Sequence, residues 1–324
     1  MSIARHPSTF ELEPNGPFSL DPLRQMNCGF LRGTRSCAAG EAVKVAFPRD
    51  GDFTVVGVTL REQAGRVEGK VVGTTDAGPI ARQVARVLGL DQDGAAFANV
   101  LERDVVLRRV VTGHPGFRPV VAYSPYVMGG WAVLSQRLRM DQAAALQVKL
   151  AQATGDVVDI EGDVVASFPR PQSLLAMGGF PGISTEKWRR LETLAEAALG
   201  GELEVDRVIE APYAEARARL MSLRGVGPWT ADAILMRGSG LTDLLPISEP
   251  TLRSAIQLAY ELEALPDDET VSRIAETWRP FRTWVSVLLI SHDFEGAQRL
   301  VRGQTSGRAR GGRNRATGIP LPRR

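Results

Sequence analysis

The sequence predicts an α+β fold, in which a small N-terminal domain of antiparallel strands and helix precedes a longer, mostly helical part. Two observations carry this prediction. Short Val-rich stretches separated by turn residues occur before residue 104, whereas apolar residues at helical spacing dominate from about residue 115. The 324 residues are enough for two domains with a sizeable core.

The N-terminal α+β domain is expected to span residues 1–104. Its segments EAVKVAFPRD, FTVVGVTLREQ and RVEGKVVGTT have the short, Val-rich character of strands in an antiparallel sheet. In PIARQVARVLGL, the residues Ile80, Val84 and Val87 recur at helical spacing. A helix is therefore expected after the strands.

The helical part is expected over residues 105–292. Ser124 can cap a helix that has Pro125 at its first position, where a missing N–H costs nothing. Ser184 can open a second helix in the same way, with an acidic first turn. Pro280 interrupts the last helical stretch and precedes a strongly apolar final helix.

Composition excludes several classes of protein. No run of eighteen apolar residues indicates a membrane span, and the N-terminus lacks the apolar core of a signal peptide. We therefore expect a cytoplasmic protein, associated with the nucleoid if it acts on DNA. Cys28 and Cys37 cannot form a four-cysteine metal site and are expected to be reduced thiols. The histidines His6, His114 and His292 are too scattered to indicate a metal centre.

The C-terminal residues 293–324 are expected to be a disordered basic tail. Eight arginines and no acidic residue occur between Arg299 and Arg324, so the preceding part has a net charge of about −6, which is +2 minus 8. Gly and Arg dominate the tail and apolar residues are few. Such a tail suits loose contact with phosphates, or serves only as a solvated solubility segment.

The stretch LRGVGPWTADAILMRGSG contains a tight Gly-Val-Gly-Pro loop between two helices. Gly225 and Gly227 can adopt positive φ, and Pro228 suits the first turn of the second helix. Backbone N–H groups at a helix N-terminus form a site for an anion such as a phosphate. An ordinary helix–helix corner with glycines for close packing is the alternative. The residues assigned to a phosphate-binding hairpin are Arg224, Gly225, Val226, Gly227 and Thr230.

This stretch resembles the helix-hairpin-helix motif of the DNA glycosylase superfamily with a Gly/Pro-rich loop, and more narrowly the DNA-3-methyladenine glycosylase II family. The segments SPYVMGGWAVLSQRLRMDQAAAL, FPRPQSLLAM, GISTEKWRRLETLAEAALGGEL and WRPFRTWVSVLLISH follow in that family's order. The resemblance covers residues 105–292, and the segment before them fits the family's N-terminal domain. It implies two helical subdomains with an active-site cleft between them.

The resemblance also implies a partner and a reaction. The partner is double-stranded DNA containing a damaged base. The protein is expected to act as a monomer and not to bind a membrane. The enzyme takes the base out of the stack, and a side chain fills the gap. That wedge corresponds to Arg137 or Leu138. Alternatively, these two side chains simply face solvent and core.

Trp229 occupies the position at which the endonuclease III branch carries its nucleophilic lysine. The four-cysteine cluster of that branch is also missing, so a bifunctional glycosylase/lyase of that type is excluded. Trp229 matches the tryptophan of the alkylation-repair branch, where the ring lines the base pocket. An electron-rich ring attracts a cationic alkylated base. A core tryptophan is the alternative.

The family's catalytic aspartate corresponds to Glu249, within the stretch PISEPTLR. The position before it, an aspartate in the family, is Ser248. Two aromatic positions of the family's base pocket correspond to Ile290 and Ala233. Asp232 is expected on the outer face of its helix. Pro250 should hold the backbone of Glu249 extended.

Three functions remain open at this point. The first is a monofunctional DNA glycosylase of base excision repair, a hydrolase that releases alkylated purines such as 3-methyladenine with Glu249 as its catalytic carboxylate. The second is a non-catalytic DNA- or lesion-binding protein on the same scaffold, and a helical interaction protein unrelated to DNA is a third. No organic cofactor is implied. The resemblance allows a structural cation held by the backbone carbonyls of Leu223 and Val226.

Overall fold

The computed structural model describes residues 8–25 and 41–292. The expectations for Cys28, Cys37 and the basic tail from residue 293 onward lie outside the described residues. Helices long and apolar enough to cross a membrane are absent from the described part of the chain.

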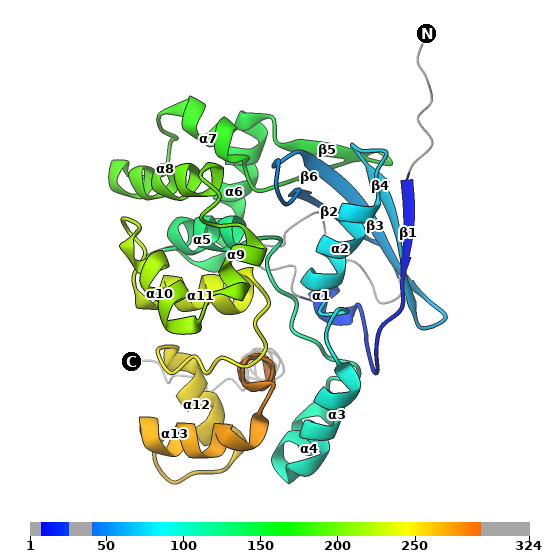
Figure 1. Ribbon diagram of the computed structural model, residues 1–324, viewed down its shortest axis with the longest axis vertical. Helices are drawn as coiled ribbons and strands as arrows, with labels where there is room; N and C mark the ends of the chain where they lie inside the picture. Colours follow the sequence, from blue (N-terminus) through cyan, green and yellow to red (C-terminus); the bar gives the residue numbers. More distant parts are fainter. Residues whose placement is uncertain (1–7, 26–40, 293–324) are drawn as a thin grey trace, which may run out of the picture.

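The N-terminal sheet has four antiparallel strands in the order β1-β4-β3-β2. Its strands are β1 (Ser8–Leu12), β2 (Val43–Pro48), β3 (Val55–Gln63) and β4 (Arg66–Val72). The three Val-rich segments thus form strands as predicted, and β1 adds an edge strand paired with β4. Helix α2 (Gly78–Val87) covers the sheet and buries its predicted apolar residues, Ile80, Val84 and Val87 (Figure 1).

A second, two-stranded sheet lies within the part that was expected to be mostly helical. Strands β5 (Val157–Ile160) and β6 (Asp163–Ala166) form a hairpin that packs against β2 and β3. Lys44 of β2 donates to Asp163 at 2.7 Å, and Lys70 of β4 donates to Glu161 at 2.7 Å. The hairpin therefore joins the N-terminal sheet to the helical part.

Helices make up most of the remaining described chain. Those before the hairpin loop are α1 (Asp21–Gln25), α3 (Gly94–Arg103), α4 (Val105–Thr112), α5 (Pro125–Leu134), α6 (Met140–Thr154), α7 (Pro171–Met177), α8 (Thr185–Leu199), α9 (Val205–Glu210) and α10 (Tyr213–Ser222). Those after it are α11 (Pro228–Ala233), the π-helix η1 (Ile234–Gly238), α12 (Pro250–Ala259), α13 (Asp268–Ala275), the 3-10 helix η2 (Glu276–Trp278) and a final helix over 282–292. Ser124 and Ser184 cap α5 and α8 as predicted, by accepting from the N–H groups of Val127 and Lys187.

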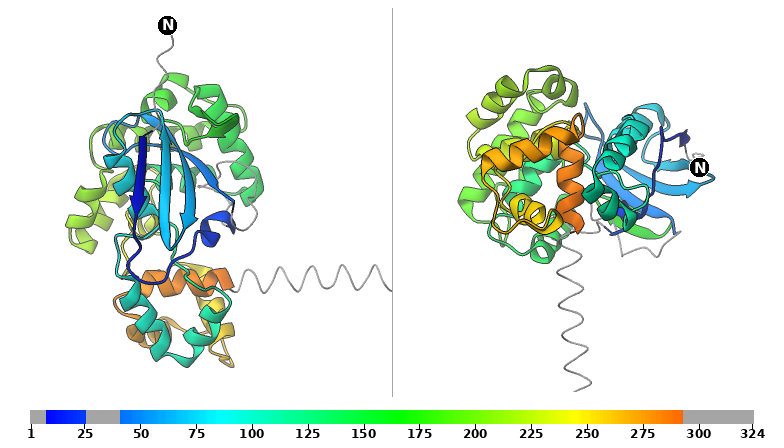
Figure 2. Two further views of the ribbon diagram at one scale, coloured as in Figure 1. Left: turned by 90° about the vertical axis from the view of Figure 1, so that its right-hand side faces the viewer. Right: turned by 90° about the horizontal axis from the view of Figure 1, so that it is seen from below.

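Buried apolar residues form two large clusters. One joins the sheet and α2 to α5, α8 and α11. The other joins α3 and α4 to α12, α13 and the final helix, so segments far apart in sequence lie side by side (Figures 1 and 2). Helix α3 thus packs with the C-terminal helices, although the boundary at residue 104 itself stays a prediction. The predicted α+β class, with a small antiparallel domain and two helical subdomains, is confirmed.

One buried side chain links the N-terminal segment to the connection between α4 and α5. Arg118 is 1% exposed, and its guanidinium donates to the carbonyls of Pro17 at 3.0 Å and Gly89 at 2.7 Å, and also to that of Asn15. Burial lowers the pKa of Arg118. Its positive charge is therefore held by carbonyl dipoles within the fold.

Candidate active site

The Gly-Val-Gly-Pro loop forms the expected hairpin between α10 and α11. Helix α10 ends at Ser222, and the N–H of Val226 donates to the carbonyl of Leu223 at 3.1 Å. Gly227 is the residue before α11, and Pro228 is its first residue. Because η1 follows α11 without a break, the helix after the loop runs from 228 to 238.

Glycine occurs at the two loop positions for different structural reasons. Gly225 has φ +86°, and a Cβ there would lie 2.4 Å from the Cγ of Arg190. Gly227 was also expected to allow positive φ, but its φ is −89° and a Cβ there would meet nothing within 4 Å. The fold therefore requires glycine at 225, whereas at 227 it only leaves the backbone open to an approaching ligand.

The hairpin borders an open hollow of about 730 Å³. The hollow is lined by Gln136, Arg190, Met221, Ser222, Leu223, Arg224, Gly225, Val226, Gly227, Trp229 and Thr230. All residues assigned to the phosphate-binding hairpin are thus on one surface, together with Trp229. The side chains of Val226 and Thr230 are buried, so these two offer mainly their backbone.

Cationic side chains surround this hollow. Glu186 forms ion pairs with Arg190 at 3.3 Å and with Arg224 at 3.4 Å. Burial, with the nearby charges of Arg137 and Arg190, lowers the pKa of Lys187. Among the described residues around the hollow, Arg137, Lys187, Arg190 and Arg224 outnumber the carboxylates of Glu186 and Glu249, and this excess of positive charge favours an anionic partner.

The two wedge candidates differ in exposure. Arg137 is exposed and has φ +57°, in the turn between α5 and α6. Leu138 is half-buried and packs against the large core that includes α5 and α8. Arg137 therefore points outward beside the hollow, because its neighbour Gln136 lines it.

Glu249 lies at the N-terminus of α12, with the extended backbone that Pro250 was expected to impose (φ −84°, ψ 110°). One carboxylate oxygen, Oε1, accepts from the backbone N–H and the hydroxyl of Thr251 at 3.2 and 2.7 Å. The other, Oε2, accepts from Nε1 of Trp229 at 3.0 Å. The structure thus brings the assigned catalytic carboxylate and the assigned pocket tryptophan into direct contact.

The other two assigned pocket residues lie elsewhere. Ala233 is 6% exposed and packs in the core with α5. Ile290 is half-buried against the cluster of the C-terminal helices. Neither lines the hollow beside the hairpin, so their pocket role stays a prediction. Trp229 is 42% exposed, contrary to the alternative of a core tryptophan.

Asp232 is not on the outer face of its helix, as was expected, but is 8% exposed. Its Oδ1 accepts from the hydroxyl of Tyr213 at 3.0 Å and from Nε of Arg217 at 2.7 Å. Its Oδ2 accepts from the hydroxyl of Ser248 at 3.0 Å. Burial and the bond to Asp232 raise the pKa of Tyr213. Asp232 therefore ties α10 and α11 to the loop that carries Glu249.

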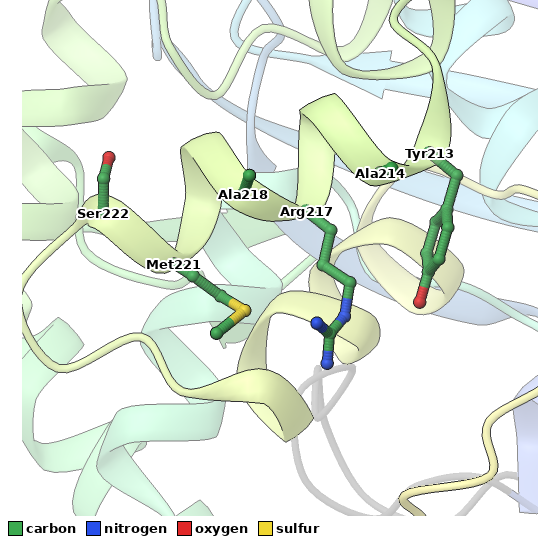
Figure 3. Close-up of a pocket in the computed structure, with 6 residues that line it drawn as sticks. All are labelled: Tyr213, Ala214, Arg217, Ala218, Met221 and Ser222. Carbon is green, nitrogen blue, oxygen red and sulfur yellow. The ribbon is translucent and has the colours of Figure 1, made fainter.

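A second hollow, of about 650 Å³, runs along the outer face of α10. Figure 3 shows its lining residues, Tyr213, Ala214, Arg217, Ala218, Met221 and Ser222. Met221 and Ser222 also line the hollow at the hairpin, so the two hollows share part of their lining. Groups of three or more His, Cys, Asp or Glu side chains able to hold a metal are absent from residues 8–25 and 41–292.

Comparisons with known proteins point in one direction. No protein-family model matches the chain. Bacillus subtilis YfjP, a DNA-3-methyladenine glycosylase by assignment, is 24% identical over 280 residues, or 84% of this chain and 91% of YfjP. Escherichia coli DNA-3-methyladenine glycosylase 2 is 26% identical over 182 residues, or 55% of this chain and 61% of that enzyme.

A solved structure shares the fold of this chain over most of its length. The 3-methyladenine DNA glycosylase of Archaeoglobus fulgidus superimposes with a TM-score of 0.72 at 21% identity, over 88% of this chain and 98% of that one. The fold is therefore that of the helix-hairpin-helix DNA glycosylases, and the predicted resemblance to DNA-3-methyladenine glycosylase II is confirmed.

Proposed function

We propose that the protein is a monofunctional DNA glycosylase of base excision repair, which hydrolyses the N-glycosidic bond of alkylated purines such as 3-methyladenine. The observation that carries this proposal is the contact between Trp229 and Glu249 beside the hairpin, at 3.0 Å. An exposed aromatic face and a carboxylate are thereby adjacent, as a cationic base and a developing sugar cation require. The similarity to DNA-3-methyladenine glycosylases supports the same substrate class.

The chemistry needs little acid catalysis. The alkylated base already carries a positive charge, so the pair of electrons in the N-glycosidic bond leaves with the base and neutralises it. The sugar is left with an oxocarbenium-like cation, which the carboxylate of Glu249 stabilises before water attacks. The face of Trp229 would hold the flipped base by stacking and cation–π attraction.

The DNA is held by its backbone. Gly225 and Gly227 line the hollow together with Arg190 and Arg224, and their backbone N–H groups would bind a phosphate there. Arg137 would fill the gap left by the flipped nucleotide, since it is exposed whereas Leu138 packs against the core. The partner is duplex DNA with a damaged base, and we propose that one monomer engages it, at the nucleoid.

A structural cation at the hairpin also remains part of this proposal. The carbonyl oxygen of Leu223 accepts a hydrogen bond from the N–H of Val226 and has a second lone pair. That lone pair and the carbonyl oxygen of Val226 could together coordinate a cation. No organic cofactor is needed for the hydrolysis.

The test is release of free base from methylated duplex DNA by the wild type and by Glu249→Gln. The amide keeps the shape of the side chain and removes its charge, so release should fall by about a hundredfold or more, while binding to the duplex persists. Glu263→Gln, at an exposed glutamate beyond α12, is the matched control and should match the wild type.

Two results would contradict the proposal. Equal release by the wild type and Glu249→Gln would remove Glu249 from the chemistry. Binding without release by either protein would favour the non-catalytic lesion-binding alternative, which the placement of Ala233 in the core also favours.

A further inference from the structure

The carboxylate of Glu249 has both of its oxygens fixed by hydrogen bonds. Thr251 occupies Oε1 with its N–H and its hydroxyl, and Trp229 occupies Oε2 with its indole N–H. The Thr251 bonds are local, two residues along the chain. The hydrogen bond from the indole N–H of Trp229 therefore ties this carboxylate to α11.

A glutamate needs such a bond more than an aspartate would. Its side chain has an additional rotatable bond, so its carboxylate samples more positions unless outside contacts hold it. A carboxylate misplaced by about 1 Å can cost about a hundredfold in rate. The indole bond removes this freedom, and it is charge-assisted and therefore strong for its type.

The loop around Glu249 is itself anchored to the same helix. Trp229 and Asp232 are one turn apart on α11, and Asp232 accepts the hydroxyl of Ser248 at 3.0 Å. The backbone of Glu249 is held by this bond on one side and by the start of α12 on the other. Because the backbone is fixed, loss of the indole N–H would release Oε2 and leave the carboxylate held only by its local bonds to Thr251.

Trp229 is not required for the core. Its side chain is 42% exposed and lines the hollow at the hairpin, so a smaller ring can replace it without leaving a buried cavity. Its ring face and its N–H can thus be separated by substitution.

We propose that Trp229 is a positioning residue for the reaction: its indole N–H holds the Glu249 carboxylate at the hairpin hollow, while its ring face receives the base. This inference rests on the proposed glycosylase function. It assigns one side chain to both binding and the geometry of the carboxylate.

The two roles of Trp229, positioning the carboxylate and binding the base, can be distinguished by kcat and KM. Trp229→Phe keeps an aromatic face but has no N–H donor, so kcat should fall by about 10- to 100-fold while KM changes by only about a few-fold. Trp229→Ala removes both, and KM should rise as well. A side chain with a merely structural role would not produce this division between kcat and KM.

A double-mutant cycle tests whether Trp229 acts through Glu249. In Glu249→Asp the carboxylate is withdrawn by one carbon–carbon bond, about 1.5 Å, and no longer reaches the indole N–H. Adding Trp229→Phe to Glu249→Asp should therefore lower kcat by less than about twofold. An equal loss in both backgrounds would overturn the proposal.

The bond can also be observed without turnover. The sequence has five tryptophans, and Trp229→Phe identifies the indole N–H resonance of Trp229 in an NMR spectrum of the full chain. That resonance should move in Glu249→Gln. An unmoved resonance overturns the proposal even if base is released, whereas an absence of base release by the wild type overturns the glycosylase function on which it rests.

Discussion

Trp278 and Trp229 both donate their indole N–H into hydrogen bonds that lead to a carboxylate, and the surroundings of the two rings are opposite. Trp278 is fully buried, and its Nε1 donates to the hydroxyl oxygen of Tyr260 at 3.1 Å, which in turn donates to Asp104 at 2.6 Å. Trp229 is 42% exposed and donates directly to Glu249. Both indole N–H groups are hydrogen-bond donors, but only the ring of Trp229 is exposed to a ligand.

This difference in exposure indicates that Trp278 serves stability and Trp229 serves function. The Trp278 chain connects α4, α12 and η2 inside the cluster of the C-terminal helices. Burial and the bond to Asp104 raise the pKa of Tyr260, so its hydroxyl stays protonated and keeps donating. The Trp229 pair contributes little to the core, so we expect it to be retained for what it does at the surface.

The largest expected effect is on the buried side. Trp278→Ala should lower the free energy of unfolding by about 3–5 kcal/mol, because it leaves a cavity and removes the hydrogen bond that the Tyr260 hydroxyl accepts. Trp229→Ala should change it by about 1 kcal/mol or less. Urea unfolding of both variants measures the contrast, and similar losses in the two would break the comparison.

The two glycines of the hairpin allow the same contrast between stability and function to be tested within one loop. Gly225→Ala should destabilise the protein by about 1–3 kcal/mol, because its φ is positive and Arg190 occupies the space of a Cβ. Gly227→Ala should leave stability within about 0.5 kcal/mol and weaken DNA binding by about tenfold, since its Cβ would project into open space where a phosphate is expected.

Thermal unfolding and binding to duplex DNA measure the two glycine variants. If Gly227→Ala binds DNA as tightly as the wild type, the hairpin is an ordinary helix–helix corner. Weak binding by Gly225→Ala alone would mean that the loop's shape, and not access to its amides, determines affinity.

The smallest effect is expected at the wedge. Arg137→Ala should weaken binding to damaged duplex by about a few-fold and lower the salt dependence of binding by about one charge. Arg103→Ala, at an exposed arginine on α3, is the control with the same change in net charge. Equal effects in the two variants would indicate loss of general charge and no specific role for Arg137.

Local signals predicted a large share of this structure. Ser124, followed by Pro125, fixed the start of α5, and the spacing of Ile80, Val84 and Val87 fixed the buried face of α2. Such features depend on neighbours within one or two helical turns, so the sequence shows them directly. The same holds for two features of the hairpin, the positive φ of Gly225 and the position of Pro228 at the start of α11.

Features that depend on distant partners were missed. Strands β5 and β6 have four residues each and a Glu-Gly turn, too short to stand out among helices, and they are strands because β2 and β3 lie beneath them. Asp232 was expected to face outward because its partners, Tyr213, Arg217 and Ser248, lie at least fifteen positions away in the sequence. The bond from Trp229 to Glu249 spans twenty residues and has no local signature.

Arg118 has a consequence for how this protein can be divided. Its guanidinium is solvated by carbonyls from two separate segments of the N-terminal domain, Pro17 after β1 and Gly89 after α2. A truncated chain that begins at residue 105 would retain the cation and lose those carbonyls. The helical part is therefore not a detachable module, and shortening the gene from its 5′ side would require replacing Arg118 with a neutral residue.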